Sequence, residues 1–421
     1  MENKKLCVVG LGYIGLPTSA MFATHGYQVH GVDLNEKVVD ALNEGKIVIE
    51  EPYLDILVQA AVRSEHLKAD TKPCEADAFI IAVPTPMTED KSADMSYVIS
   101  AAEMILPYLK EGNVVILEST SPTGTVENIL VPILEKSGLK IGEELFVGHS
   151  PERVLPGKIL WELVNNDRIV GGINRISAEK IRDIYRIFVN GEIFLTTATT
   201  AEMCKMMENT YRDVNIALAN ELAKICEKTG INAWDVINLA NKHPRVNLHQ
   251  PGPGVGGHCL AVDPWFIVEK NPELAHIIKL SRETNEGMPE FVVEKIKTIV
   301  KGIKKPKIAI LGVTYKPNID DMRESPIMEI VHLLKEEGVE VSIFEPHVEI
   351  EEFKDMSLLE VCRDSDLAVL AVNHDAFNDL PFADIKRVMK NGNILDTRNF
   401  LDGDSLKSLG FNYYLLGNGG N

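Results

Sequence analysis

The feature that most limits what this chain can fold into is a group of three glycines near its N-terminus. The run Gly10-Leu11-Gly12-Tyr13-Ile14-Gly15 directly follows an apolar stretch, 6–10, and precedes residues with helical spacing. A carboxylate, Asp33, closes the next apolar stretch, 28–33. Glycines in such a context permit a tight turn, a close approach of the backbone to a pyrophosphate, and close packing of the helix on the strand.

The glycine motif also occurs where only packing requires glycine, but the acid at the end of the second strand favours dinucleotide binding. The N-terminus of the helix would hold the pyrophosphate. Asp33 can accept hydrogen bonds from ribose hydroxyls and would repel a 2'-phosphate, so NAD is preferred over NADP. The predicted cofactor contacts here are Gly10, Gly12, Tyr13, Ile14, Gly15 and Asp33.

Apolar runs alternate with helical stretches as far as Leu195. This alternation is typical of a parallel sheet covered by helices, and near-continuous apolar strands fit burial on both faces. We therefore expect a Rossmann domain over 1–198, with strands at 6–10, 28–33, 77–83, 113–118, 144–148 and 167–171.

A mostly helical stretch, 199–300, follows this first domain. Thr199 and Glu202 have the spacing of a capping box, and helical spacing then continues to Gly230, so the pattern predicts one long helix. Further helices are expected at 233–241 and 275–300. This central domain should join two sheet domains and is a natural surface for dimerisation.

A second set of strands is predicted at 307–312, 340–344, 367–371 and 393–396, again alternating with helices. We expect a second doubly wound, Rossmann-like domain over 301–421. Its first strand is followed by Gly312 but not by a full glycine motif, so a second dinucleotide site is not expected. The predicted fold class is α/β, with two Rossmann-like domains joined by a long central helix and a helical middle domain.

Composition excludes several classes of protein. The formal net charge of -19 would repel nucleic-acid backbones. The six cysteines are scattered without a C-x-x-C pair, so we expect neither a metal site nor a disulfide framework, and a reducing compartment fits best. Glycines interrupt the first apolar run, unlike in a signal peptide, and no run reaches the ~18 apolar residues of a membrane helix. We expect a cytoplasmic protein that binds neither nucleic acid nor a membrane.

The densest group of unusual residues lies between His243 and Pro264. Several glycines around Gly254 would place backbone amides close to a ligand, and Cys259 follows them at a position where chemistry could occur. A single cysteine is more often a small buried hydrophobe. On the preceding helix, Lys205 and Asn209 are four residues apart and share a face, which suits either catalysis or a solvated polar stripe.

At this point the sequence resembles the UDP-sugar 6-dehydrogenases of the UDP-glucose/GDP-mannose dehydrogenase family. The resemblance spans nearly the whole chain. It is carried by the glycine motif, Thr85-Pro86, Glu118-Ser119-Thr120, Ser150-Pro151-Glu152-Arg153, Lys205 with Asn209, the Cys259 loop, Tyr315-Lys316-Pro317, Asp321-Met322-Arg323-Glu324-Ser325-Pro326, and Arg398.

The resemblance implies a four-electron oxidation of an alcohol to an acid with two NAD per substrate. Cys259 would hold the aldehyde as a thiohemiacetal and then as a thioester. Lys205 would assist deprotonation of the alcohol and stabilise the oxyanion, with Asn209 beside it. Asp263, Thr120 and Glu152 match residues around the hydrolytic water, with Glu152 as the preferred base. Thr120 is also a candidate helix N-cap.

The resemblance also implies where the ligands bind. Thr85, Thr120 and Arg323 would contact NAD. Arg245 would reach the substrate of a neighbouring subunit, so at least a homodimer is implied. The expected UDP-sugar contacts are Arg153, Val154, Leu155, Lys205, Asn209, Arg212, His243, Arg245, Gly256, Tyr315, Lys316 and Arg398.

The loop Cys259-Leu260-Ala261-Val262-Asp263 departs from the UDP-glucose branch, which commonly has lysine before the aspartate. The segments 150–157, 243–247 and 251–266 look most like enzymes acting on UDP-N-acetyl-D-mannosamine, which implies that substrate and its uronate product. UDP-N-acetylglucosamine and UDP-glucose remain alternatives. A 3-hydroxyacid dehydrogenase would make one hydride transfer and need no cysteine, and a binding protein that had lost its chemistry would lack intact catalytic positions.

Overall fold

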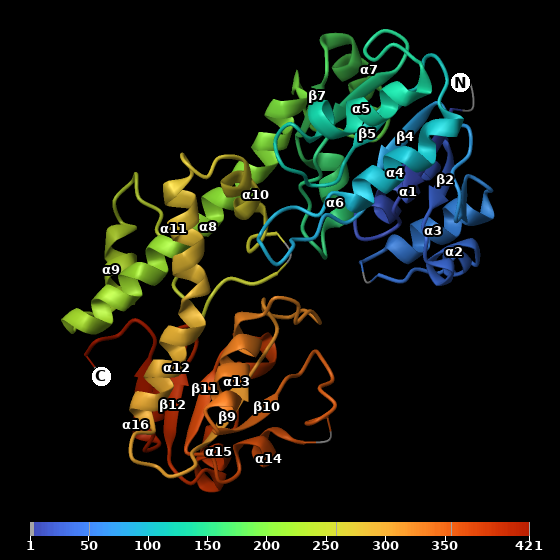
Figure 1. The fold of residues 1–421 in the computed structure, drawn as a ribbon. Coiled ribbons are helices and arrows are strands. Elements are labelled where there is room, and N and C mark those ends of the chain that lie inside the picture. The colour runs from blue at the N-terminus through green and yellow to red at the C-terminus, as the bar shows by residue number, and fades with distance from the viewer. Residues whose placement is uncertain (1–3, 50, 258, 355, 421) are drawn as a thin grey trace. The chain divides into compact units, whose positions relative to one another are not determined.

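The computed structural model describes residues 4–49, 51–257, 259–354 and 356–420. The chain forms two compact units, one ending at Glu208 and the other beginning at Asn209, and each is described by itself. Figure 1 shows the elements of both units along the chain. Helix α8 (Ala198–Thr229) is continuous through the residues at which the units divide.

The first unit is built on an eight-stranded sheet with the order β3-β2-β1-β4-β5-β6-β7-β8. Neighbouring strands pair in parallel, except β6 and β7, which are antiparallel. The strand order reverses between β1 and β4, the switch point beside which open sheets bind ligands. The strands are β1 (Lys5–Val9), β2 (Gln28–Val32), β3 (Leu67–Asp70), β4 (Ala78–Ile81), β5 (Val114–Leu117), β6 (Phe146–His149), β7 (Arg168–Gly172) and β8 (Ile193–Thr197).

Two apolar layers bury this sheet, because its strands are apolar on both faces. One layer is formed with α1 (Gly15–Thr24), α2 (Glu36–Asn43), α3 (Leu54–Arg63), α6 (Ile159–Asn165) and α7 (Arg175–Tyr185). The other is formed with α4 (Ser96–Ile105), the π-helix η2 (Val126–Leu130) and α5 (Val131–Leu134). Leu106 and Tyr108 of the short 3-10 turn η1 (Leu106–Tyr108) pack against this layer, and a second 3-10 turn, η3 (Glu135–Ser137), follows α5.

The second unit contains a five-stranded, fully parallel sheet with the order β10-β9-β11-β12-β13. Its strands are β9 (Lys307–Leu311), β10 (Glu340–Phe344), β11 (Leu367–Leu370), β12 (Asn393–Asp396) and β13 (Asn412–Leu415). Helices α12 (Met288–Ile299) and α13 (Pro326–Glu336) cover one face. Helices α14 (Leu358–Cys362), α15 (Phe382–Val388) and α16 (Gly403–Ser408), with the turn η4 (Asp375–Phe377), cover the other.

The helical part of this unit consists of the end of α8 and three further helices before α12. These are α9 (Ala233–Ala240), α10 (Asp263–Lys270) and α11 (His276–Glu286). Gly287 separates α11 from α12, so the helical stretch predicted over 275–300 is two helices. The doubly wound architecture predicted from the sequence is confirmed for both sheets.

Three strands were missed by the sequence pattern: β3, β8 and β13. All three lie at an edge of their sheet. Each of them is only partly buried, so it lacks the continuous apolar run that identifies a central strand. The antiparallel pairing of β7 was also not expected from the alternation of strands and helices.

The predicted capping box at the start of α8 is wrong. The carboxylate of Glu202 accepts the amides of Gly124 (2.5 Å), in the preceding turn, and of Val126 (2.8 Å), the first residue of the π-helix η2. The hydroxyl of Thr197 instead accepts the amide of Thr200 (3.2 Å) and so caps α8. The tertiary neighbour therefore takes the carboxylate that the local spacing had assigned to the helix itself.

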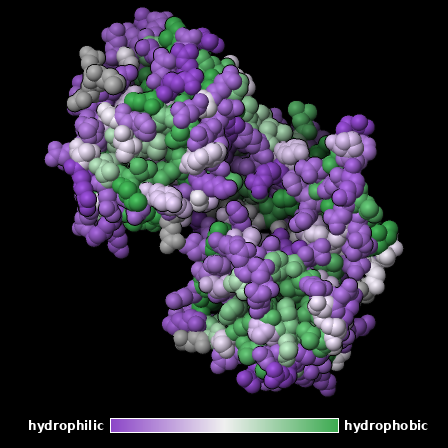
Figure 2. All heavy atoms as spheres, turned by 180° about the vertical axis from the view of Figure 1, so that it is seen from behind, coloured by the Kyte–Doolittle hydropathy of each residue, from purple (hydrophilic) through white to green (hydrophobic). Residues whose placement is uncertain are grey.

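Polar side chains predominate on the face in Figure 2, with hydrophobic residues interspersed among them. No helix among the described residues is both long and apolar enough to cross a membrane.

Candidate active site

The glycine motif has the local geometry that its sequence predicted. Gly10 has a φ of +96°, and a Cβ there would lie 2.5 Å from the carbonyl oxygen of Ala82. A Cβ on Gly15 would lie 1.8 Å from the carbonyl oxygen of Gly10, so α1 could not begin where it does. A Cβ on Gly12 would meet no heavy atom within 4 Å. Packing therefore explains Gly10 and Gly15, whereas no neighbour within the unit requires a glycine at Gly12, where the motif predicts the approach of a pyrophosphate.

Asp33 lies just beyond β2, beside the glycine turn. Its Oδ2 accepts the amide of Leu11 (3.0 Å), and its Oδ1 accepts the amide of Asn35 (2.9 Å). Each carboxylate oxygen has a second lone pair, so each can also accept a hydrogen bond from a ribose hydroxyl. Tyr13, in the turn, is 43% exposed. The geometry fits a dinucleotide with a ribose against Asp33.

Thr85 and Thr120 follow β4 and β5, neighbouring strands at the switch point. The Thr85 hydroxyl donates to the carbonyl oxygen of Thr120 (2.7 Å), which joins the two loops. Thr120 does not cap a helix, because the first amides of the following helical segment are held by Glu202. The N-cap interpretation of Thr120 is therefore wrong, and its side chain is available at the edge of the sheet where the dinucleotide motif lies.

Glu152 belongs to a buried charged cluster. Its Oε2 pairs with Arg168 Nη2, and its Oε1 accepts the amide of Arg153 (2.8 Å). Arg168 Nη1 donates to Ser150 (3.1 Å) and lies 3.7 Å from Glu118 Oε1. Two carboxylates thus share one buried guanidinium. Burial raises the pKa of Glu118 to about 7, against the opposing effect of Arg168.

The Tyr185 hydroxyl donates to Glu118 (2.5 Å), and its ring lies 4.2 Å from the Arg168 guanidinium carbon. The sequence pattern did not predict a charged cluster around Glu118, and it did not indicate Arg168 at all. The available signal was an arginine at the start of an otherwise apolar strand, since buried charge normally has a partner.

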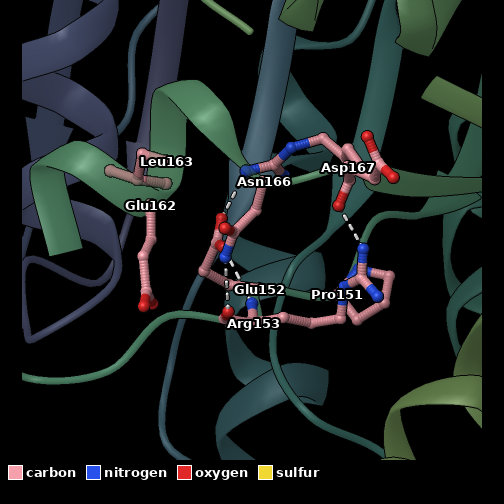
Figure 3. A pocket seen from close by; sticks show the side chains of 8 residues that line it. Pro151, Glu152, Arg153, Glu162, Leu163, Asn166 and Asp167 are labelled. Carbon is pink, nitrogen blue, oxygen red and sulfur yellow. Dashed lines mark hydrogen bonds and ion pairs between the residues drawn. The ribbon is translucent and has the colours of Figure 1, made fainter. Parts of the chain in front are cut away.

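A small cavity of about 10 Å³ lies beside Glu152, at the lower limit of the volume that one water needs. Figure 3 shows Glu152 and Arg153 on the segment after β6, with Glu162 and Leu163 on α6. The Arg153 guanidinium donates to Glu208 (2.7 Å) and to the carbonyl of Asp167. The lining residues are Pro151, Glu152, Arg153, Glu162, Leu163, Asn166, Asp167 and Arg168.

The other two substrate candidates of this segment differ in exposure. Val154 packs against the core of the first unit, whereas Leu155 is 47% exposed. The amide of Leu155 donates to Glu162 (2.7 Å).

Lys205 and Asn209 are about one helical turn apart on α8. Arg212, which follows on the same helix, is exposed. The Asn209 side-chain amide donates to Asp263 Oδ2 (2.5 Å). Asp263 is 2% exposed and is the first residue of α10. The predicted neighbours Asn209 and Asp263 are therefore in direct contact, although they are far apart in the sequence.

Cys259 is exposed and begins the turn that leads into α10. Its carbonyl oxygen accepts the amides of Val262 (3.1 Å) and Asp263 (2.8 Å). The same turn therefore fixes the cysteine backbone relative to the carboxylate that Asn209 holds. The interpretation of Cys259 as a small buried hydrophobe is wrong.

The glycines before Cys259 pack on the second sheet domain. A Cβ on Gly256 would lie 2.3 Å from the carbonyl oxygen of Glu324 and 2.9 Å from Tyr315 Cβ. Gly257 has a φ of +83°, and a Cβ there would lie 2.8 Å from the Tyr315 ring. Gly256 thus has a packing role against Tyr315, whatever its contact with substrate.

Lys316 is exposed in the loop after β9, and a buried pair supports this loop. Glu345 Oε2 accepts the amides of Val313 (2.8 Å) and Thr314 (3.3 Å). His374 Nδ1 accepts the amide of Asn318 (2.9 Å), while its Nε2 lies 3.3 Å from Glu345. The histidine and the glutamate were not predicted from the sequence, because neither belongs to a recognisable local motif.

Arg398 follows β12 and is a desolvated cation. Its Nε donates to the carbonyl oxygen of Ala371 (3.2 Å), and its Nη1 would lie 2.5 Å from a Cβ on Gly252. Burial lowers its pKa to about 10, against the opposing effect of Asp396. A guanidinium next to a glycine loop at the carboxyl edge of a parallel sheet suits a diphosphate.

The remaining predicted cations are exposed. Arg323 forms a two-point contact with Asp321, through Nε (2.9 Å) and Nη2 (2.7 Å). His243 and Arg245 lie just after α9, where the amide of Arg245 donates to His243 Nδ1 (3.4 Å). No group of three or more His, Cys, Asp or Glu side chains that could hold a metal occurs within the described chain.

Three models of one family match the sequence. They are described as the NAD binding domain, the central domain and the UDP binding domain of the UDP-glucose/GDP-mannose dehydrogenase family, and they match residues 4–189, 199–287 and 309–403.

Individual relatives match over nearly the full length. A Methanococcus maripaludis protein named UDP-N-acetyl-D-mannosamine dehydrogenase is 51% identical, over 99% of this chain and 98% of its own. A Ralstonia solanacearum protein named NDP-N-acetyl-D-galactosaminuronic acid dehydrogenase is 47% identical, over 90% and 93%. A solved structure of the UDP-N-acetyl-mannosamine dehydrogenase from S. aureus has a TM-score of 0.90 and 49% identity, covering 98% and 99%.

Proposed function

Because the chain belongs to the UDP-glucose/GDP-mannose dehydrogenase family and is an NAD-dependent sugar-nucleotide dehydrogenase, we propose that it oxidises UDP-N-acetyl-D-mannosamine to UDP-N-acetyl-D-mannosaminuronate. The observation that carries this choice of sugar is the 51% identity over 99% of the chain to a relative of that name. We assign NAD binding to 1–198, the central helical domain to 199–300 and UDP-sugar binding to 301–421, in the cytoplasm.

The proposed reaction removes two hydrides from C6 of the sugar. NAD supplies a hydride acceptor for each oxidation, so one sugar consumes two NAD. Lys205 assists loss of the C6 hydroxyl proton as the first hydride leaves, which yields an aldehyde. The Cys259 thiolate then forms a bond from Sγ to C6, and Lys205 with Asn209 stabilises the thiohemiacetal oxygen.

Loss of the second hydride converts the thiohemiacetal into a thioester on Cys259. Water then adds to C6, the bond to Sγ breaks, and the acid and the thiolate are released. Glu152 is the proposed base for this water, with Asp263 and Thr120 positioning it. The contact between Asn209 and Asp263 and the small cavity beside Glu152 support these assignments.

The proposed reaction also assigns each predicted contact residue to NAD or to the sugar nucleotide. Arg398 and Lys316 suit the diphosphate of the substrate, because they lie at the carboxyl edge of the second sheet. Thr85 and Arg323 are assigned to NAD. The other assigned substrate contacts are Arg153, Val154, Leu155, Arg212, His243, Arg245, Gly256 and Tyr315.

We further infer a homodimer in which Arg245 reaches the substrate of the neighbouring subunit. Its exposure fits this role. On α8, exposed Tyr211, Leu218 and Ile225 recur at intervals of seven residues. Such spacing is typical of a seam that packs against another helix.

The test counts NADH released per sugar consumed, with NAD in excess. The four substrates are the UDP derivatives of N-acetylmannosamine, N-acetylglucosamine, N-acetylgalactosamine and glucose. We expect two NADH with the mannosamine derivative as the preferred sugar. Preference for another sugar would refute the substrate assignment alone, and the Ralstonia relative makes N-acetylgalactosamine the necessary comparison.

Cys259→Ala is the matched control for the thioester route. Without Sγ the aldehyde has no covalent hold, so we expect at most one NADH per sugar and no uronate. If this variant still released two NADH per sugar at the wild-type rate, the covalent mechanism would be wrong, whereas the sugar preference would stand.

A further inference from the structure

Two carboxylates hold the backbone of the segment that follows Arg153. Alternate amides along this segment point at side chains from other parts of the first unit. The amide of Leu155 donates to Glu162 Oε2 (2.7 Å), that of Gly157 to Glu51 Oε2 (2.7 Å), and that of Ile159 to Glu51 Oε1 (2.8 Å). The segment forms neither helix nor strand until α6 begins, so these bonds determine its path.

Glu51 is the more buried of the two carboxylates. It is 6% exposed and lies in the connection between α2 and α3, about a hundred residues before its partners. Burying a carboxylate is unfavourable unless hydrogen bonds replace its water. Both oxygens of Glu51 receive a backbone amide, and the second amide belongs to the first turn of α6, where the helix dipole favours negative charge.

We propose that Glu51 is a positioning residue for the sugar nucleotide, because it holds the segment that carries Arg153, Val154 and Leu155. This inference rests on the proposed function, which assigns those three residues to the substrate. Glu51 itself faces inward and does not contact the ligand. Its two hydrogen bonds select one backbone path for the segment before substrate arrives, which lowers the cost of ordering it on binding.

The substitution Glu51→Gln removes one of the two acceptors with little change in size. Glutamine has one carbonyl oxygen, and its NH2 group would face the second backbone N–H, donor against donor. The segment must then shift, or lose the bond to Gly157 or to Ile159. The glycine motif and Asp33 are not part of this network, so NAD binding should be unaffected.

The experiment compares steady-state kinetics and amide hydrogen exchange of wild type and Glu51→Gln. We expect KM for the sugar nucleotide to rise about tenfold, the difference made by ~1.4 kcal/mol. KM for NAD should stay within about twofold. The amides of Gly157 and Ile159 should exchange at least about tenfold faster, which a defect elsewhere in the domain would not cause.

Asn174→Ala is the matched control, because it removes a cap from another helix of the same unit. Asn174 Oδ1 accepts the amide of Ser177 (2.8 Å) at the start of α7. Loss of this hydrogen bond in Asn174→Ala should lower the free energy of unfolding about as much as Glu51→Gln does. It should not change KM for the sugar nucleotide. Equal rises of KM for the sugar and for NAD in Glu51→Gln, or a fall in kcat alone, would overturn the proposal.

Two further measurements distinguish failure of the proposed function from failure of the inference about Glu51. If the wild type oxidises no UDP-sugar, the proposed function fails, whereas the exchange rates still test whether Glu51 holds the segment. If Glu51→Gln does not fold, Glu162→Ala tests the same segment, because it removes the acceptor of the Leu155 amide. We then expect KM for the sugar nucleotide to rise about threefold while KM for NAD stays normal. An unchanged KM for the sugar nucleotide would refute the proposal that these carboxylates position the segment after Arg153.

Discussion

At the scale of single residues, buried carboxyl groups determine how the first unit responds to pH. Burial raises the pKa of Glu118 from the ordinary 4.5 to about 7, with Arg168 lowering it and Glu152 raising it. Tyr185 and Thr18 donate to the same carboxylate. The unfolded chain therefore releases this proton at a lower pH than the folded chain does.

The sign of the effect on stability follows from proton linkage. Between about pH 4.5 and 7 the folded state binds more protons at Glu118 than the unfolded state, so stability falls as pH rises through this window. Glu118→Gln cannot ionise. Relative to wild type, we expect this variant to gain about 2 kcal/mol between pH 5.5 and pH 8.

The measurement is the free energy of opening of β5, from native-state hydrogen exchange at the two pH values. Glu103→Gln, an exposed substitution in the same unit, serves as the control and should show the wild-type pH dependence. Parallel pH dependences of Glu118→Gln and wild type would contradict the raised pKa.

At the scale of elements, the start of the π-helix η2 depends on a side chain from α8. Glu202 is fully buried and accepts the amides of Gly124 and Val126. It thus joins the loop after β5, which carries Thr120, to the helix that carries Lys205. Burial raises the pKa of Glu202 to about 7, against the opposing effect of those amides.

Glu202→Ala should destabilise the first unit by about 2 kcal/mol, because it leaves two buried amides without acceptors. Urea denaturation of the two proteins gives the difference. Glu127→Ala is the matched control, since Glu127 is an exposed residue of η2 that accepts from Thr199 (3.0 Å). Its expected cost is below about 0.5 kcal/mol, and an equal loss in both variants would exclude the capping role.

At the scale of the whole molecule, the proposed dimer depends on the apolar seam of α8. Tyr211, Leu218 and Ile225 are each at least half exposed, which is costly for side chains of this size in water. The net charge of -19 opposes association of two copies, so the seam has to supply the attraction.

Leu218→Asp should convert the dimer into monomers, because it places a carboxylate in the middle of the seam on each copy. Sedimentation at micromolar protein gives the oligomeric state. Lys136→Asp, an exposed change on a different element, should leave the dimer intact. A dimer that survives Leu218→Asp with unchanged affinity would show that another surface associates.

The sequence by itself determined the features that depend on neighbouring residues. The turn at Gly10, the central strands of both sheets and the long helix α8 could be predicted, because backbone conformation and apolar periodicity are local properties. The family resemblance also predicts roles for Cys259 and for Asp263, which lies four residues later in the sequence.

Only the tertiary structure decided which side chains hold these parts in place. Glu51 meets Gly157, Glu202 meets Gly124 and Arg168 lies between two glutamates, each across at least sixteen residues of sequence. The edge strands and the antiparallel pairing of β7 were decided in the same way. A buried charge takes whichever partner the fold brings within hydrogen-bonding distance, and no local pattern records that choice.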